Sequence, residues 1–305
     1  MTQTTLRYRG AAPAARPPGE LELPCRIGQW ELVELAAEGS FADIYRARAL
    51  ATPADRPAAY ALKMLRAQWQ ESPRAMDLLS REATVGRSVS HPNVVAILAA
   101  SVHDSPQFLV MPWLDGCTLQ ARLSAGQQFD LPEVLWLARQ TAEGLDALHQ
   151  AGWMHGDLKP SNLMVSPEGH VTLLDLGFAR RCEETGSVVD RCVLGTCNYL
   201  APEWITSTLR ADIRSDIYSL GVMLFELLTG RLPFVGNDLA DLATQHLQSA
   251  PPNLARLAPH LPSEVVDLVR QMIAKEPLRR PQSPCELADR LVRLEIASFG
   301  QRSWP

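Results

Sequence analysis

The sequence predicts an α+β fold in which strands come first, around one main helix, and helices follow. Apolar runs with strand-like alternation fall within roughly the first 111 residues. Longer segments with helical periodicity and N-cap residues fill most of the remainder. Within the second part, after a helix-like run, lies a stretch from Gly152 to Val165 that we call the polar loop; it places an acid, a base and an amide close together.

The bulk properties indicate a globular protein without a membrane or nucleic-acid role. A length of 305 residues is enough for one large domain or two lobes with a sizeable core. A net charge of −5 gives no general basic footprint for nucleic acid or for an anionic membrane. The longest apolar run, residues 220–228, is too short to span a bilayer, and the N-terminus lacks a signal-peptide core. We therefore expect no membrane span and a cytoplasmic location.

The first third of the chain carries the strand patterns. Residues 1–28 are rich in Pro, Ala, Arg and Gly and are expected to form a flexible leader. We expect strands at residues 30–37, 42–49, 60–63, 94–99 and 107–111. A helix is expected after Ser72, which would cap it, with Pro73 at its first position.

The rest of the chain carries the helix patterns. The sequence Asp130-Leu-Pro-Glu133 is a capping box, and the helix it opens is expected to stop near Gly152. Residues 216–230 are apolar nearly all round, which indicates a buried core helix. Further helices are expected at about residues 239–248, at 264–274 with Ser263 as cap, and at 285–298 after a capping box that starts at Ser283.

Four polar residues carry the chemistry. Asp157, Lys159 and Asn162 share the polar loop, and Asp175 follows the next strand-like run by ten residues. Two acids and an amide at strand ends or loops can ligate Mg²⁺ and accept a proton from an attacking hydroxyl, which is the equipment of phosphoryl transfer. A lone Asp or Asn is usually a turn residue, so the interpretation depends on all four residues together.

These residues stand in motifs that resemble those of protein kinases. His155-Gly-Asp157 with Asn162 resembles the catalytic loop, and Asp175-Leu-Gly177 resembles the metal-binding Asp-Phe-Gly. Tyr60-Ala-Leu-Lys63 resembles Val-Ala-Ile-Lys, and residues 195–203 resemble the Ala-Pro-Glu end of the activation segment. The sequence is most similar to bacterial members of the eukaryotic-type, or Hanks-type, serine/threonine protein kinase family, over about residues 29–296.

The resemblance implies a fold and an activity. It implies a bilobal fold with a small antiparallel sheet and one main helix in the N-lobe (29–111), a hinge (112–116) and a mostly helical C-lobe (117–296), followed by a short tail (297–305). The implied activity is transfer of the γ-phosphoryl group of ATP to Ser or Thr hydroxyls of protein substrates.

The resemblance also assigns roles to individual residues. Asp157 would accept the hydroxyl proton, and Lys159 would neutralise charge on the γ-phosphoryl oxygens. Asn162 and Asp175 would hold Mg²⁺, with Mn²⁺ as an alternative. Lys63 would grip the α- and β-phosphates while paired with Glu82. The adenine would meet the hinge residues Met111, Pro112 and Leu114 and pack against Ile44, Ala61 and Met164.

Two departures from the family pattern bear on activity. The glycine-rich loop keeps its middle glycine, Gly39, followed by Ser40, whereas Ala37 and Ala42 hold the outer places. An alanine forced to positive φ would cost about 1–2 kcal/mol, and an alanine in ordinary β conformation would cost nearly nothing. Gly156 replaces the arginine that anchors a phosphorylated activation segment, so we expect basal activity without that phosphorylation.

Several questions stay open from the sequence. Thr185 and Ser187 are candidate phosphosites, and Thr196 together with Lys159 favours Ser or Thr as acceptor. A non-catalytic nucleotide-binding scaffold and a small-molecule kinase of the aminoglycoside or choline type are the alternative functions. A regulatory protein partner or a dimer is left open, and no nucleic-acid partner is expected.

Overall fold

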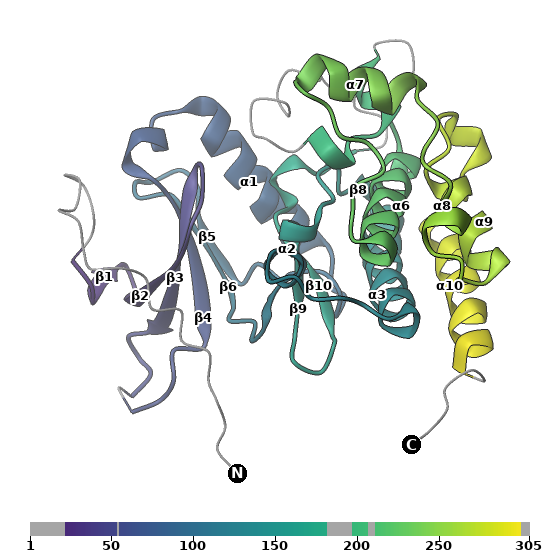
Figure 1. Ribbon diagram of the computed structural model, residues 1–305. Coiled ribbons are helices and arrows are strands. Elements are labelled where there is room, and N and C mark those ends of the chain that lie inside the picture. Colours follow the sequence, from purple (N-terminus) through teal and green to yellow (C-terminus); the bar gives the residue numbers. More distant parts are fainter. Residues whose placement is uncertain (1–21, 54, 182–196, 207–210, 300–305) are drawn as a thin grey trace.

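The computed structural model describes residues 22–53, 55–181, 197–206 and 211–299. The six strands of its largest sheet gather in one half of the molecule with α1, Pro73–Ser88, and most of its helices lie in the other half together with short strands of two smaller sheets (Figure 1). This arrangement confirms the expected α+β, two-lobed architecture. No helix in these ranges is both long and apolar enough to cross a membrane.

The N-terminal half contains a six-stranded sheet in which every neighbouring pair is antiparallel. The strand order is β1-β2-β3-β4-β6-β5. The bounds are β1 Cys25–Ile27, β2 Trp30–Glu38, β3 Ala42–Ala49, β4 Tyr60–Leu65, β5 Ala99–Ser101 and β6 Phe108–Pro112. Alternate residues of these strands bury a small apolar core that includes Trp30, Leu32, Tyr45, Leu62 and Val110.

Two expectations about the sheet were wrong. The stretch expected to be a leader contributes β1, which pairs with β2 from Cys25 to Ile27. The strand expected at residues 94–99 does not form, and β5 starts only at Ala99. Val95 instead donates its N–H to the Leu173 carbonyl at 3.0 Å. The apolar pattern of this stretch therefore reflects burial beside the C-terminal half, where the side chains of Val94 and Val95 lie in the main core.

The main helix of this half is α1, Pro73–Ser88, which begins where the sequence predicts. The Ser72 hydroxyl accepts from the Ala75 N–H at 3.4 Å, and Pro73 holds the first helical position. One face of α1 is buried, and this face includes Leu79 and the carboxylate residue Glu82. The helix thus delivers a charged side chain into the interior.

The C-terminal half is built around α3, Leu131–Gln150, and α6, Ile213–Thr229. The Asp130 side chain accepts from the Glu133 N–H at 2.8 Å, as the capping box predicts. Gly152 has a φ of +81°, which suits its place just after the helix end. The other helices are α2 Leu119–Ser124, α5 Pro202–Ile205, α7 Leu239–Gln248, α8 Leu254–Leu257, α9 Ser263–Met272 and α10 Pro284–Phe299.

The sequence predicted that helices α6 and α9 form, but it placed the first residue of each helix wrongly. The buried helix α6 begins at Ile213, three residues before the expected start, because the Asp212 side chain accepts from the Arg214 N–H at 2.9 Å. Ser263 does not cap α9. Pro262 holds the cap position, and the Ser263 hydroxyl donates to Glu264 at 3.0 Å. A Ser before an apolar run can therefore lie inside the first turn.

Short strands at the junction of the two halves position the polar loop. β9, Leu163–Val165, pairs with β10, Val171–Leu173, and with β7, Cys117–Thr118. β8, Trp153–Met154, pairs with β11, Arg180–Arg181. The polar loop runs from β8 to β9, and its ends are therefore fixed by two separate ladders.

Candidate active site

The pairing of β9 with β10 brings two of the predicted residues to one end of a small sheet. Leu163 is opposite Leu173 in this antiparallel ladder. Asn162 directly precedes β9, and Asp175 lies two residues past the end of β10. The Leu174 N–H also donates to the Asn162 carbonyl at 2.9 Å. An amide and a carboxylate that are distant in the sequence are thus held at neighbouring strand ends.

Helix α6 anchors the polar loop through the side chain of Asp216. The Asp216 carboxylate accepts from the His155 N–H at 2.7 Å and from the Gly156 N–H at 2.8 Å. The buried His155 ring contacts the Leu174 carbonyl through Nε2 at 3.0 Å. His155 therefore acts as a structural support, as expected. Gly156 has a φ of +77°, a region that glycine adopts without strain.

The catalytic-loop residues contact one another. Lys159 Nζ lies 2.8 Å from Asp157 Oδ2. The Asn162 side-chain amide donates to the Asp157 carbonyl at 2.8 Å and to Asp157 Oδ2 at 3.2 Å. Lys159 and Asn162 thus both contact the same carboxylate oxygen of Asp157, and only 9% of that side chain is exposed. The loop thus presents one oriented acid with a cation beside it.

Lys63 joins the two halves of the molecule. Its Nζ lies 2.6 Å from Glu82 Oε2 on α1 and 2.9 Å from Asp175 Oδ1. The predicted Lys63–Glu82 pair is therefore present, and the ammonium is shared with a second carboxylate. Lys63 is separated from Asp175 by 112 positions in the sequence.

In the triad of Lys63, Glu82 and Asp175, the pKa values of the two acids are shifted in opposite directions. Burial raises the pKa of Glu82 to about 7, against the opposing effect of Lys63. Burial alone would also raise the pKa of Asp175, but the attraction of Lys63 outweighs it and the pKa of Asp175 is lowered. Burial would lower the pKa of Lys63, but the two carboxylates more than offset this and raise it. The ammonium and Asp175 thus stay charged, while Glu82 is the acid that gains a proton first.

One cavity brings together residues from both halves. Gly39, Ser40, Lys63 and Glu82 line it from the N-terminal half. Asp157, Lys159 and Asp175 line it from the C-terminal half. Sequence reasoning missed six further lining residues, which are Phe41, Leu65, Ala75, Leu78, Leu79 and Phe178. Their apolar character alone does not distinguish them from core residues, which is why the sequence gave no indication of their position.

The residues expected to hold the adenine lie apart from this cavity. Ala61 on β4 is opposite Met111 on β6, and Ile44 on β3 is opposite Lys63. Pro112 ends β6, Leu114 follows it, and Met164 lies on β9. None of these six residues lines the cavity described above. Their contact with adenine stays a prediction.

The loop over the cavity tolerates its two alanines. Ala37 is opposite Ile44, and Ala42 is opposite Leu65 in the antiparallel sheet. Among the described residues, Asp175 alone of the non-glycine residues has positive φ. The alanines therefore have ordinary conformations and impose no left-handed strain. At Gly39, a Cβ would lie 2.4 Å from the Ala42 carbonyl oxygen, so the retained glycine is the one that the turn requires.

The donor set suits Mg²⁺. Asn162 and Asp175 offer oxygen ligands, which hard divalent cations prefer. The Asn162 amide nitrogen is already used by Asp157, which leaves its carbonyl oxygen as the group to face a cation. No cluster of three or more His, Cys, Asp or Glu side chains with metal-binding geometry occurs in the described part of the chain.

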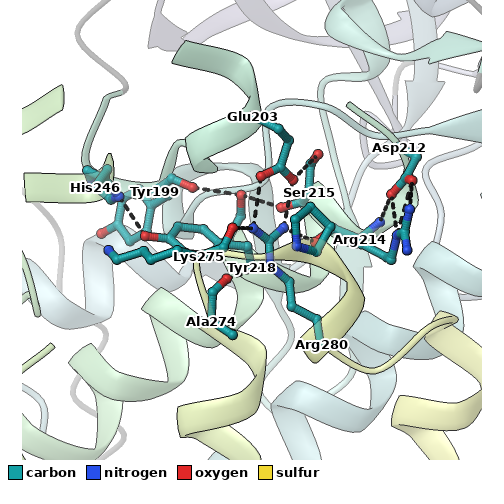
Figure 2. A network of polar contacts seen from close by, with 12 residues as sticks. Tyr199, Glu203, Asp212, Arg214, Ser215, Tyr218, His246, Ala274, Lys275 and Arg280 are labelled. Carbon is teal, nitrogen blue, oxygen red and sulfur yellow. Dashed lines mark hydrogen bonds and ion pairs between the residues drawn. The ribbon is translucent and has the colours of Figure 1, made fainter. Parts of the chain in front are cut away.

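A second polar network supports the C-terminal half (Figure 2). Glu203 and Arg280 form two contacts of 2.6 and 2.8 Å. The Ser215 hydroxyl donates to Glu203 at 2.6 Å, and the Tyr218 hydroxyl contacts His246 Nδ1 at 2.9 Å. Sequence reasoning did not assign Ser215, Tyr218 or His246 to this network, because each lies in a pattern that indicates only a helix.

Three predicted positions lie outside the described residues. They are the candidate phosphosites Thr185 and Ser187, and Thr196, which together with Lys159 favours Ser or Thr as acceptor.

Comparison with known proteins identifies the family. The family model of the protein kinase domain matches residues 30–291. Serine/threonine-protein kinase PrkC of Bacillus subtilis is 32% identical over 253 residues, which cover 83% of this chain and 38% of that protein. A probable serine/threonine-protein kinase of Streptomyces coelicolor, SCO3848, is 34% identical over 289 residues, or 92% of this chain and 42% of that protein.

Serine/threonine-protein kinase PknB of Mycolicibacterium smegmatis is 31% identical over 272 residues, which cover 87% of this chain and 43% of that protein. The chain thus spans about two-fifths of the length of these relatives. The family match covers most of the chain and includes every residue that we placed in the cavity. This chain therefore belongs to the protein kinase domain family.

Proposed function

We propose that this chain transfers the γ-phosphoryl group of ATP to Ser or Thr hydroxyls of protein substrates. The observation that carries the proposal is the meeting of Lys63 with Asp175 in the same cavity as Asp157 and Lys159. Phosphoryl transfer needs positioned charges more than covalent chemistry. This cavity supplies two ion-paired groups, Lys63 with Glu82 and Asp175, and Lys159 with Asp157. The three relatives described above are named as serine/threonine-protein kinases, one of them as probable, and this supports the acceptor class.

Each residue has a defined task in this proposal. Asp157, held by Asn162, accepts the proton of the attacking hydroxyl. Lys159 stabilises negative charge on the transferred group, and Lys63 holds the nonreacting phosphates while Glu82 orients it. Asn162 and Asp175 would hold Mg²⁺, or Mn²⁺ as an alternative, and this ion would neutralise the phosphate oxygens.

The structure gives little support to a non-catalytic scaffold. That alternative depended on Ala37 and Ala42 in place of glycines and on Leu176 in place of the phenylalanine of Asp-Phe-Gly. Both alanines lie in unstrained strand positions, and leucine is an apolar replacement that leaves Asp175 in place. The small-molecule alternative depended on Gly156, whose N–H bonds to Asp216 as part of the loop anchor. Neither observation favours an alternative over a protein kinase.

The direct test is phosphate incorporation from labelled ATP into a generic protein substrate. We expect label on Ser or Thr with the wild type. Asp157→Ala should lower turnover by about 10²–10⁴ because it removes the proton acceptor, while nucleotide binding persists. Asp104→Ala, which changes an exposed acid in a distant turn, is the matched control and should keep full turnover.

Two outcomes would contradict the proposal. If the wild type binds Mg²⁺ and ATP but never transfers phosphate to protein or small alcohol, the chain is a nucleotide-binding scaffold. If phosphate appears only on a small alcohol, the acceptor class is wrong.

A further inference from the structure

We infer that Arg66 and Trp69, on the connector between β4 and α1, hold the loop over the phosphate end of the cavity and act as positioning residues for ATP. The connector is residues 66–72, and the covering loop is residues 38–43, between β2 and β3. The role in ATP binding depends on the proposed function, whereas the contacts themselves do not.

Trp69 holds the tip of the covering loop. Its indole N–H donates to the Ser40 carbonyl at 2.9 Å. Its ring meets the ring of Phe41 edge-on, with centroids 4.8 Å apart and an interplanar angle of 61°. This is a favourable geometry for two aromatic rings. One side chain therefore fixes two successive residues at the tip.

Arg66 holds both sides of the same loop. Its backbone N–H donates to the Phe41 carbonyl at 2.9 Å. Its guanidinium lies 3.0 Å from the Asp43 carboxylate and 3.6 Å from that of Glu38. Asp43 in turn accepts from the Gly39 N–H at 3.4 Å. The loop is thus bonded to the connector at its start, tip and end.

These contacts link the covering loop to the helix that carries Glu82. The connector includes a 3-10 helix, Ala67–Trp69, and Ser72, which caps α1. Loop residues Ser40 and Phe41 and helix residues Leu78 and Leu79 line the same cavity. The covering loop and α1 are therefore held in one relative position by a short, hydrogen-bonded segment.

The consequence is preorganisation of the ATP site. A loop that is free to move must be ordered when the nucleotide binds, and this lowers affinity. Contacts that hold the loop in place before ATP binds avoid this loss of affinity. Trp69 and Arg66 do not themselves line the cavity, so their effect passes through Ser40 and Phe41. We therefore expect them to change KM for ATP much more than kcat.

The test combines hydrogen exchange with steady-state kinetics. Trp69→Ala should speed amide exchange at residues 38–43 in the nucleotide-free protein. It should also raise KM for ATP about tenfold, from the loss of one hydrogen bond and one aromatic pair, with kcat within about twofold of wild type. Trp69→Phe keeps a ring against Phe41 but loses the indole donor, and it should give a smaller rise in KM.

Trp136→Ala is the matched control. Trp136 is also partly exposed, at 43%, and its indole N–H also donates to a backbone carbonyl, that of Gly169 at 2.8 Å. It lies on α3, and it does not line the cavity. Its replacement should leave both exchange at residues 38–43 and KM for ATP unchanged. Arg66→Gln is a second variant, expected to change both quantities in the same direction as Trp69→Ala.

The outcomes separate this inference from the proposed function. Unchanged exchange at residues 38–43 in both Trp69→Ala and Arg66→Gln would overturn the inference whatever the enzyme assay shows. Faster exchange with an unchanged KM, or an equal rise of KM in Trp136→Ala, would overturn the positioning role. If the wild type fails to bind ATP, the proposed function and the positioning role both fall, while the exchange data still decide whether the connector holds the loop.

Discussion

Two buried ion pairs in this molecule have different surroundings. The Arg280 and Glu203 side chains are 0% and 1% exposed. Arg280 also donates to the carbonyls of Ala274, Arg214 and Lys275, so its guanidinium is bonded on several sides within the fold (Figure 2). The Lys63 side chain is 18% exposed, lines a cavity, and is shared by Glu82 and by Asp175, whose side chain is 37% exposed.

This difference indicates what each pair is for. A closed pair whose donors bond to protein groups stabilises one conformation and has little capacity for a ligand. In an open pair, the cation lies beside a cavity and two carboxylates compete for it. Such a cation can exchange one carboxylate for a phosphate when a ligand binds. Perturbed pKa values gather at such sites, and the Glu82 pKa of about 7 fits this rule. On the proposed function, the same residue chemistry thus serves stability in one place and nucleotide binding in the other.

The largest expected effect comes from breaking the open pair. Lys63→Met should lower kcat/KM about 10³-fold, because it removes a preorganised cation from the phosphate site. The midpoint of thermal unfolding should fall only slightly, because Glu82 can take up a proton once its partner is gone. Kinetic assays and thermal unfolding on the same preparation measure both. Lys275→Met, in the network of Figure 2, is the control and should retain turnover.

The distinction between the open and the closed pair would be wrong if Lys63→Met lowered the midpoint of thermal unfolding as much as a change in the closed pair. It would also fail if Lys275→Met lost as much activity as Lys63→Met.

Breaking the closed pair should instead destabilise the fold. Arg280→Met leaves the Glu203 charge buried without its partner, which typically lowers the free energy of unfolding by about 3–5 kcal/mol. For a domain of this size, this corresponds to a fall of roughly 10 °C in the unfolding midpoint. Arg279→Met is the neighbouring control. Its side chain is 72% exposed and pairs with Glu276 at 2.9 Å, so the change should be within about 0.5 kcal/mol.

Thermal or urea unfolding measures the loss of stability in Arg280→Met and Arg279→Met. Equal losses would show that burial does not determine how much each arginine contributes to stability.

A smaller effect is expected from pH. Because the pKa of Glu82 is raised to about 7, it gains a proton as the pH falls through 7, and its attraction for Lys63 weakens. We therefore expect kcat/KM for ATP to decline below about pH 7. Glu82→Gln, which cannot titrate, should be less active and should lack this decline. A pH–rate profile that keeps the same shape in Glu82→Gln would assign the titration to another group.

The stability effect of Glu82 has the opposite sign. An acid whose pKa is higher in the folded state than in the unfolded one binds a proton more readily when folded. Its contribution to stability is therefore unfavourable above pH 7 and improves as the pH falls from 7 towards its ordinary range. The difference in unfolding free energy between wild type and Glu82→Gln should change in this direction between pH 8 and pH 5.

Much of the site could be predicted because its residues occur in local patterns with fixed spacing. Asp157, Lys159 and Asn162 are within five positions on one loop, so their mutual contacts follow from the loop itself. The Lys63–Glu82 pair was also predicted, from the match of both residues to the places of the Lys–Glu ion pair in protein kinases. The strand predicted at residues 94–99 was wrong because an apolar run does not show whether a segment joins a sheet or packs against the other half of the molecule.

By itself, the sequence determined the residue types, the periodicity of the helices and most of their caps, since these depend on neighbours within a few positions. Only the tertiary structure decided that Lys63 is shared with Asp175, 112 positions away, and that Trp69 bonds to Ser40. Such contacts depend on the register of the strands and on how the two halves face each other. Those arrangements are set by the packing of the whole chain and leave no regular spacing in the sequence.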